Sequence, residues 1–221
     1  MMSLKFTGLQ KRMIPKLLVW LLAAVWVILV WPVGVFRDSY TSKSFADDDR
    51  QTDSVTEELP VIQEFRPQYD RLRSIGFVLN RGDGEVTDGT VTLKVYDSGI
   101  QLLFQQEFSM EQVEDGKYTE AEMNLDVTPG ELYYFRIEVN GLTDGAPTLS
   151  YRSLLGCGPE ENGALYYGTT VVEDGSAVCR YEYGRPVGIL QILTYDSFGV
   201  LIGMMLTVWI TKRQENRKNR V

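Results

Sequence analysis

The tyrosines between residues 166 and 183 are the side chains best suited to binding a ligand. Residues 160–167 read EENGALYY, and residues 177–183 read AVCRYEY. Aromatic faces stack on the apolar side of a sugar ring, and neighbouring polar groups fix its hydroxyls. The sequence therefore predicts a carbohydrate site that comprises Tyr166, Tyr167, Asn162, Arg180, Tyr181 and Tyr183. The alternative is that alternate tyrosines are core residues or cross-strand pairs, because adjacent strand residues point to opposite faces.

A second candidate site is the stretch NRGDGEVTDG, residues 80–89. Asp83, Glu85 and Asp88 offer carboxylate oxygens in a glycine-rich loop, which is the ligand type that calcium prefers, although the spacing is not that of an EF-hand. Arg81-Gly82-Asp83 is also a cell-adhesion tripeptide. Asn-Arg-Gly-Asp-Gly is equally good turn chemistry between two strands. A strand connector is the preferred interpretation, and calcium is the possible cofactor.

The composition excludes several classes of catalytic site. The chain has no histidine, which removes Ser-His-Asp and Cys-His nucleophiles and histidine-based metal sites. Cys157 and Cys179 are the only cysteines, and an even count in an oxidising compartment favours a disulfide over two buried thiols. Paired carboxylates for glycoside hydrolysis are the one catalytic alternative, and nothing singles out two of them. We expect a protein that is not an enzyme.

Two apolar segments flank the acidic middle. Residues 17–36 carry no charge over twenty positions, which is enough helix to cross a bilayer. A cleaved signal peptide is the competing interpretation, but the apolar run is long and no small-x-small cleavage site follows it. Residues 187–210 form the second segment. Its first half contains polar residues that either reach the headgroup level or contact another membrane protein, namely Gln191, Thr194 and Asp196.

Charge predicts how the chain is oriented. Basic residues dominate residues 1–16 and the tail at 211–221, and such residues beside membrane spans stay in the cytoplasm. Both termini are therefore expected inside the cell and the middle outside it. Between residues 37 and 186 there are 28 acidic and 13 basic residues, a net charge of −15. That charge disfavours nucleic acid as a partner and is compatible with neutral glycans, cations or a basic protein.

The outer part has the pattern of an all-β domain. Residues 37–58 are polar and acidic, and we expect a solvated linker there. Residues 59–186 show period-2 runs separated by Asp-Gly and Pro-Gly turns, which is typical of one antiparallel β-sandwich. Nine strands are predicted, near 60–66, 72–80, 89–97, 101–109, 118–127, 132–140, 147–153, 164–172 and 177–183.

Three stretches of this domain resemble a known family. They are IQEFRPQYDRLRSIGF at 62–77, GTVTLKVYDSG at 89–99 and LYYFRIE at 132–138. Together they look like galactose-binding-like jelly-roll domains, which occur as ectodomains of Gram-positive envelope membrane proteins. The resemblance implies a jelly roll and makes glycan binding more plausible, without identifying a ligand motif.

Two functions follow as expectations. The first is a two-pass membrane protein whose jelly roll binds envelope carbohydrate. The second is an accessory subunit of a membrane complex, such as a polysaccharide exporter, polymerase or transporter, in which the second span contacts a partner helix.

Overall fold

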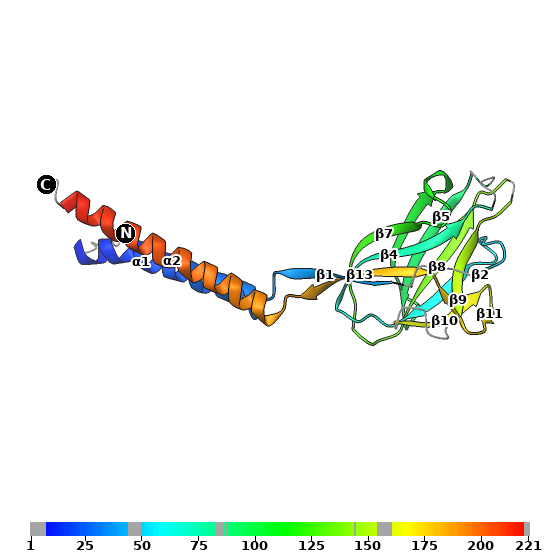
Figure 1. Cartoon of the computed structure of the whole chain (residues 1–221), viewed down its shortest axis with the longest axis horizontal. Coiled ribbons are helices and arrows are strands. Elements are labelled where there is room, and N and C mark those ends of the chain that lie inside the picture. Colours follow the sequence, from blue (N-terminus) through cyan, green and yellow to red (C-terminus); the bar gives the residue numbers. More distant parts are fainter. Residues whose placement is uncertain are drawn as a thin grey trace, which may run out of the picture. The chain divides into compact units, whose positions relative to one another are not determined.

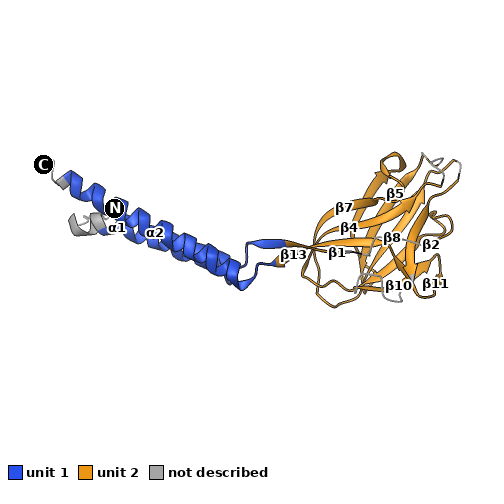
Figure 2. Cartoon of the chain, viewed as in Figure 1, with its two compact units in different colours: residues 1–38, 186–221 blue, residues 39–185 orange. Residues whose placement is uncertain are grey.

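The structure is a computed structural model that describes residues 8–43, 50–82, 86, 88–143, 145–153 and 161–218. The chain divides into two compact units (Figure 2). One unit joins Met1–Asp38 to Pro186–Val221, and the other is Ser39–Arg185. The first unit is helical and the second is built from strands.

The helical unit contains α1 (Gly8–Val30) and α2 (Ile189–Lys218). Both helices are long and apolar enough to cross a membrane by length and composition. Their apolar side chains are mostly exposed, as Leu21 at 64% and Met205 at 68% illustrate. Side chains of this kind on the outside of a helix pair are suited to a lipid environment rather than to water.

The two helices pack through small residues of α2. A Cβ atom added to Gly199 would clash with the indole of Trp26, and one added to Gly203 would lie 3.6 Å from the Cβ of Ala23. The indole Nε1 of Trp26 also donates to the backbone carbonyl of Tyr195 at 3.0 Å. Helix pairs in membranes commonly use small residues four positions apart to bring their backbones close together.

The strand unit is a two-sheet structure (Figure 1). The described residues contain thirteen strands: β1 (Arg37–Lys43), β2 (Arg50–Gln51), β3 (Val61–Phe65), β4 (Arg71–Asn80), β5 (Thr90–Asp97), β6 (Leu102–Ser109), β7 (Tyr118–Asp126), β8 (Tyr133–Asn140), β9 (Thr148–Ser153), β10 (Asn162–Tyr167), β11 (Thr170–Val172), β12 (Gly175–Ala177) and β13 (Cys179–Pro186). A short 3₁₀ helix, Met110–Gln112, follows β6.

Each sheet is antiparallel. The six-stranded sheet has the order β11-β10-β3-β8-β5-β6. The seven-stranded sheet has the order β1-β13-β4-β9-β12, and in addition β7 pairs with β4 and β2 pairs with β9. The mostly β architecture with two terminal apolar helices agrees with the fold class expected from the sequence.

Seven of the nine predicted strands are present, with their ends moved by at most one residue, and the other two are each divided between two strands. The predicted strand at 164–172 is a hairpin of β10 and β11, because the chain turns at Gly168, where φ is +59°. The predicted strand at 177–183 lies in β12 and β13.

The expected linker at 37–58 is different in the structure. Its first residues form β1, which pairs with β13, and its Arg50 and Gln51 form β2. Ser42 donates to the carboxylate of Glu161 at 2.7 Å, and Val55 is fully buried in the core. Much of the polar segment is therefore part of the sandwich, because its backbone pairs with strand edges that no local pattern reveals.

The core between the sheets is rich in aromatic residues. Phe65 of the six-stranded sheet stacks on Tyr181 of the seven-stranded sheet, with ring centroids 5.1 Å apart. Phe135 meets the same tyrosine edge to face at 6.4 Å. These rings are fully buried, and aromatic pairs in such geometries stabilise a core beyond the area that they bury.

Two side-chain amides, those of the buried Gln63 and the partly buried Asn162, join the sheets at the edge of β12. The Gln63 Oε1 accepts from the Ala177 N–H at 2.8 Å, and its Nε2 donates to the Gly163 carbonyl at 3.0 Å. The Asn162 Nδ2 donates to the Ser176 hydroxyl at 2.6 Å, while its Oδ1 accepts from the Tyr181 hydroxyl. The amides thus provide hydrogen bonds to an edge that would otherwise be buried without partners.

The substitution Gln63→Ala is expected to lower the free energy of unfolding by about 2–4 kcal/mol, because it removes a hydrogen bond from the Ala177 N–H and those to the Glu64, Gly163 and Ala164 carbonyls. Gln105→Ala, which removes an exposed amide from β6, is the matched control and is expected to change stability by less than about 0.5 kcal/mol. Pulse proteolysis of the whole chain in urea measures both. Equal stabilities for the two variants would contradict the role given to Gln63.

Candidate functional site

The outer face of the six-stranded sheet carries the aromatic side chains that the core does not use. Successive side chains of a strand point to opposite faces. In β8, Phe135 is fully buried, and Tyr134 and Arg136 are partly exposed on the other face. In β5, Val95 is buried and Tyr96 is partly exposed.

Strand register brings these outward side chains together. Tyr96 of β5 lies opposite Tyr134 of β8, and Tyr134 lies opposite Glu64 of β3. In the next row, Arg136 lies opposite Ile62 and Ile62 lies opposite Tyr166 of β10. Residues that lie directly opposite one another in a sheet have side chains in contact.

The two rows border a shallow groove of about 370 Å³. We call it the tyrosine groove, and its lining residues are Ile62, Tyr96, Ile100, Tyr134, Arg136 and Tyr166. A pocket of this size with mainly aromatic and apolar walls and a few polar groups is typical of a small-molecule or sugar site.

The charges at the tyrosine groove balance one another. The side chain of Glu138 is 4% exposed, and its carboxylate pairs with the Lys94 ammonium and with Arg136 Nε, the latter at 2.7 Å. One buried carboxylate therefore holds two cations, of which Arg136 lines the groove. Glu64 adds a second negative charge on the same face, so two carboxylates face two basic groups.

Tyr166 is held in place by Glu64. Its hydroxyl donates to Glu64 Oε1 at 3.0 Å, and the other carboxylate oxygen accepts from the Ala164 N–H at 3.3 Å. The hydrogen bond to this carboxylate raises the pKa of the Tyr166 phenol above its usual value, since deprotonation would bring two negative charges together. The ring is thus oriented with its hydroxyl fixed at one end of the groove.

The outer face of the seven-stranded sheet has a different character. Arg71 pairs with Asp126 at 3.0 Å. Arg180 pairs with Glu120, and its guanidinium lies 4.7 Å from the ring centre of Tyr118. This face is made of ion pairs that saturate one another, which is typical of a solvated surface.

The structure places most of the predicted carbohydrate residues away from the tyrosine groove. Tyr181 and Tyr183 are fully buried in the core, so neither ring can stack on a sugar. Arg180 lies on the other sheet, and the Asn162 amide is used inside the sandwich. The cause is the strand period, which places both tyrosines of β13 on the face opposite Arg180.

Tyr166 is the predicted residue that lines the tyrosine groove. Tyr167 points to the other face, packs on the core and donates to the Ser54 carbonyl at 2.7 Å. Sequence reasoning missed Tyr96 and Tyr134, although each follows an inward residue of its own strand. That alternation predicts that both tyrosines point outward. Only the β5–β8 register shows that they lie side by side.

The predicted calcium loop lies partly outside the described residues, which do not include Asp83 and Glu85. Asp88 is described, and its carboxylate accepts from the Thr143 N–H at 2.9 Å and from the Thr143 hydroxyl. These hydrogen bonds lower the pKa of Asp88. Over the described ranges, no group of three potential metal-ligating residues occurs. Calcium binding stays a prediction.

The adhesion tripeptide is described only at its first two residues. The Arg81 N–H donates to the Asp115 carboxylate at 2.5 Å, and the Arg81 Nε lies 3.9 Å from the same oxygen. This arginine is thus used to join two neighbouring turns of the sandwich, which favours the strand-connector interpretation.

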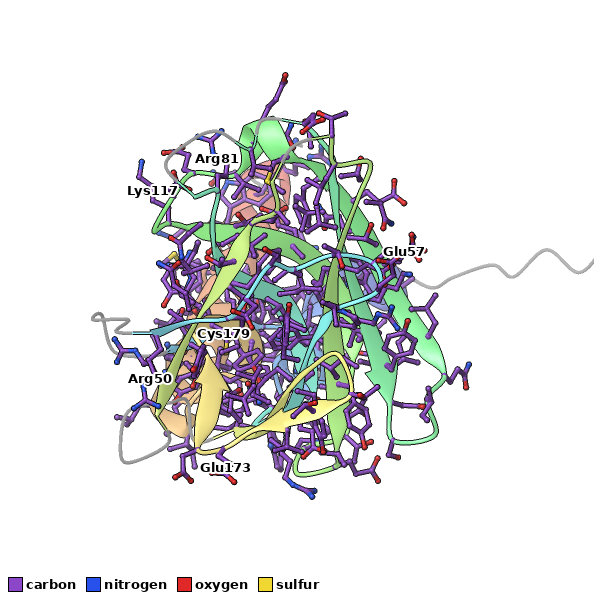
Figure 3. All side chains as sticks on the ribbon, turned by 90° about the vertical axis from the view of Figure 1, so that its right-hand side faces the viewer. Arg50, Glu57, Arg81, Lys117, Glu173 and Cys179 are labelled. Carbon is purple, nitrogen blue, oxygen red and sulfur yellow. The ribbon has the colours of Figure 1, made fainter. Side chains whose placement is uncertain are left out.

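The predicted disulfide also involves a residue outside the described ranges, Cys157. Cys179 lies inside the sandwich (Figure 3), and burial raises the pKa of its thiol to about 12. Among the described residues no disulfide is found, and the pairing stays a prediction.

The polar residues of α2 differ in how they are satisfied. Gln191 accepts from the Gly188 N–H at 2.9 Å, and Thr194 donates to the Leu190 carbonyl at 2.8 Å. The Gln191 oxygen and the Thr194 hydroxyl are therefore bonded within the first turns of the helix. The Oδ1 atom of Asp196 is enclosed and has no hydrogen-bond partner. Of the three predicted contact residues, Asp196 is the one with a buried side-chain atom that has no hydrogen-bond partner.

Comparisons with known proteins do not assign the chain to a family. No model of a known protein family matches it, and no curated protein sequence matches it. The tyrosine groove is therefore interpreted from its own geometry.

Replacing Glu64 by Gln is expected to lower the pKa of Tyr166 toward that of an ordinary tyrosine, because the negative charge beside the phenol is removed. NMR titration of ¹³C-labelled tyrosine in the full-length protein measures this directly. Tyr167 serves as the internal control, since burial rather than Glu64 raises its pKa. An unchanged Tyr166 pKa would show that the hydrogen bond to Glu64 does not form.

Proposed function

We propose that the protein is a membrane-anchored β-sandwich, not an enzyme, that binds a neutral saccharide of the cell envelope in the tyrosine groove. The observation that carries the proposal is the cross-strand placement of Tyr96, Tyr134 and Tyr166 around one groove on the outer face of the six-stranded sheet. The galactose-binding-like jelly roll that the sequence resembles belongs to the same proposal.

Aromatic walls suit a sugar ring better than they suit most polar ligands. The C–H bonds of one ring face lie against a tyrosine ring, while hydroxyls at the edge need hydrogen-bond partners. The groove offers both kinds of group, because Arg136 and the Glu64 carboxylate lie beside the tyrosines.

The charge of the site favours a neutral ligand. Glu138 already pairs with Lys94 and Arg136, so no excess positive charge is left for an anionic sugar. The surrounding domain carries a net charge of −15, which repels anions at long range. A neutral saccharide needs no excess positive charge in the groove and is not repelled by the negative charge of the domain.

The two apolar helices support the membrane anchor. Basic residues lie at the end of α2, where the guanidinium of Arg213 lies 5.1 Å from the centre of the Trp209 ring. Cations and aromatic rings of this kind are typical of the membrane–water interface on the cytoplasmic side. We therefore propose that both termini are cytoplasmic and that the sandwich faces the envelope.

The variants Tyr96→Ala and Tyr134→Ala are expected to weaken saccharide binding about tenfold each, which corresponds to ~1.4 kcal/mol, because each removes a stacking surface. Tyr118→Ala removes a tyrosine from the outer face of the other sheet and is the matched control. Isothermal titration of the full-length protein against a panel of neutral oligosaccharides provides the measurement. No binding by any member of the panel, or equal losses in all three variants, would contradict the proposal.

A second candidate function is an accessory subunit that contacts a partner helix through α2. The observation that favours it is the unsatisfied Oδ1 atom of Asp196, since polar atoms at membrane depth are costly without a hydrogen bond. In the accessory-subunit account, a donor from a partner helix satisfies the Asp196 carboxylate after a local rearrangement.

For the accessory-subunit account, Asp196→Leu is expected to abolish co-purification of the partner after crosslinking in native membranes and to leave saccharide binding intact. Gln191→Leu is the control, because the Gln191 side-chain oxygen already accepts from the Gly188 N–H at the start of α2. Retention of the same partner by the Asp196 variant would rule out this contact.

A further inference from the structure

The β5–β6 hairpin contains a residue in an unusual backbone conformation. Ile100 has φ +63°, in the left-handed region. Side chains branched at Cβ rarely adopt that region, which costs roughly 1–2 kcal/mol for an ordinary L-residue. The turn is well fixed, since the Asp97 carboxylate accepts from the backbone N–H groups of Gly99 and Gln101 at 2.9 and 2.8 Å.

Folding alone gives no reason for isoleucine at this position. Short hairpin loops of this kind normally place glycine at the left-handed residue. The Ile100 side chain is also 76% exposed, and the nearby Leu102 is 46% exposed. The side chain therefore carries backbone strain and leaves apolar surface in water. Strain of this kind, held in place by its surroundings, is characteristic of functional positions.

The position of Ile100 suggests what it does. It is one of the six residues that line the tyrosine groove, together with Tyr96 of the preceding strand. Ile62 contributes a second aliphatic side chain to the same groove, and Arg136 contributes N–H donors. Aliphatic and N–H groups are thus combined with aromatic walls in one site.

Aliphatic side chains give no hydrogen bond to a saccharide hydroxyl, whereas they can cover the methyl group of an acetamido substituent. Such a substituent carries a methyl group, which is stabilised by burial, and a carbonyl oxygen, which accepts from an N–H donor. It is also uncharged, in keeping with the balanced charges around Glu138.

We propose that Ile100 is a specificity-determining residue that contacts the methyl group of an acetamido substituent, so that the tyrosine groove selects N-acetylated neutral saccharides. This inference rests on the proposed saccharide-binding function. It explains why the strained, exposed isoleucine occupies the position of a turn glycine.

The test compares two β-1,4-linked tetrasaccharides, one of N-acetylglucosamine and one of glucose, by titration with the full-length protein. The N-acetylated tetrasaccharide is expected to bind at least about tenfold more tightly, the value of burying one methyl group together with one hydrogen bond. The variant Ile100→Gly is expected to lose most of that preference, because its affinity for the N-acetylglucosamine tetrasaccharide falls more than its affinity for the glucose tetrasaccharide.

Ile100→Gly should fold at least as well as the natural chain, since glycine adopts φ +63° without strain. Its midpoint of thermal unfolding is therefore expected to stay the same or to rise. Asp174→Gly is the matched control, because Asp174 has φ +50° in another turn and does not line the groove. That variant should keep the full preference for the N-acetylated sugar.

The outcomes separate this inference from the proposed function. Equal binding of the two tetrasaccharides, or a preference that survives Ile100→Gly, overturns the role of Ile100 and leaves saccharide binding standing. Absence of binding to these two and to the wider neutral panel overturns both. Loss of the preference in Ile100→Gly with its fold retained supports the assignment.

Discussion

The side-chain amides of Gln63 and Asn162 occupy the place where the edge of β12 meets β3 and β10. Because these amides must point inward to reach β12, the pleat directs Ile62 and Glu64 outward on β3. A register slip of β3 by one residue would move the Gln63 amide to the surface and would place Ile62 and Glu64 in the core. The position of the tyrosine groove is thus a consequence of how the sandwich is closed.

The two outer faces of the sandwich show how one fold separates a solvated surface from a binding surface. On the seven-stranded sheet, the outward side chains include the ion pairs Arg71 with Asp126 and Arg180 with Glu120. On the six-stranded sheet, Glu138 is buried and fixes two cations, while three tyrosines and two isoleucines remain accessible. An aromatic face of this kind is the usual place for a ligand or a partner.

The strands could be predicted from the sequence because alternation is a local property. β1 and β2 could not, since their sequences are polar and they form only through pairing with distant strand edges. The binding site was predicted in part. Tyr166 was found, yet Tyr96 and Tyr134 are 38 residues apart in sequence, and only strand register brings them together. The burial of Tyr181 could have been predicted from the sequence, because the neighbouring charged residue Arg180 must point to the opposite, solvent-facing side of β13.

The central claim is that tyrosines of the six-stranded sheet contact a neutral saccharide. NMR of ¹³C-tyrosine-labelled full-length protein, titrated with the N-acetylglucosamine tetrasaccharide, tests it most directly. The account predicts that the resonances of Tyr96, Tyr134 and Tyr166 shift together along one binding isotherm while those of Tyr118 and the buried Tyr181 stay in place. Shifts confined to Tyr118, or no shift at any of the three groove tyrosines at the highest saccharide concentration, would contradict it.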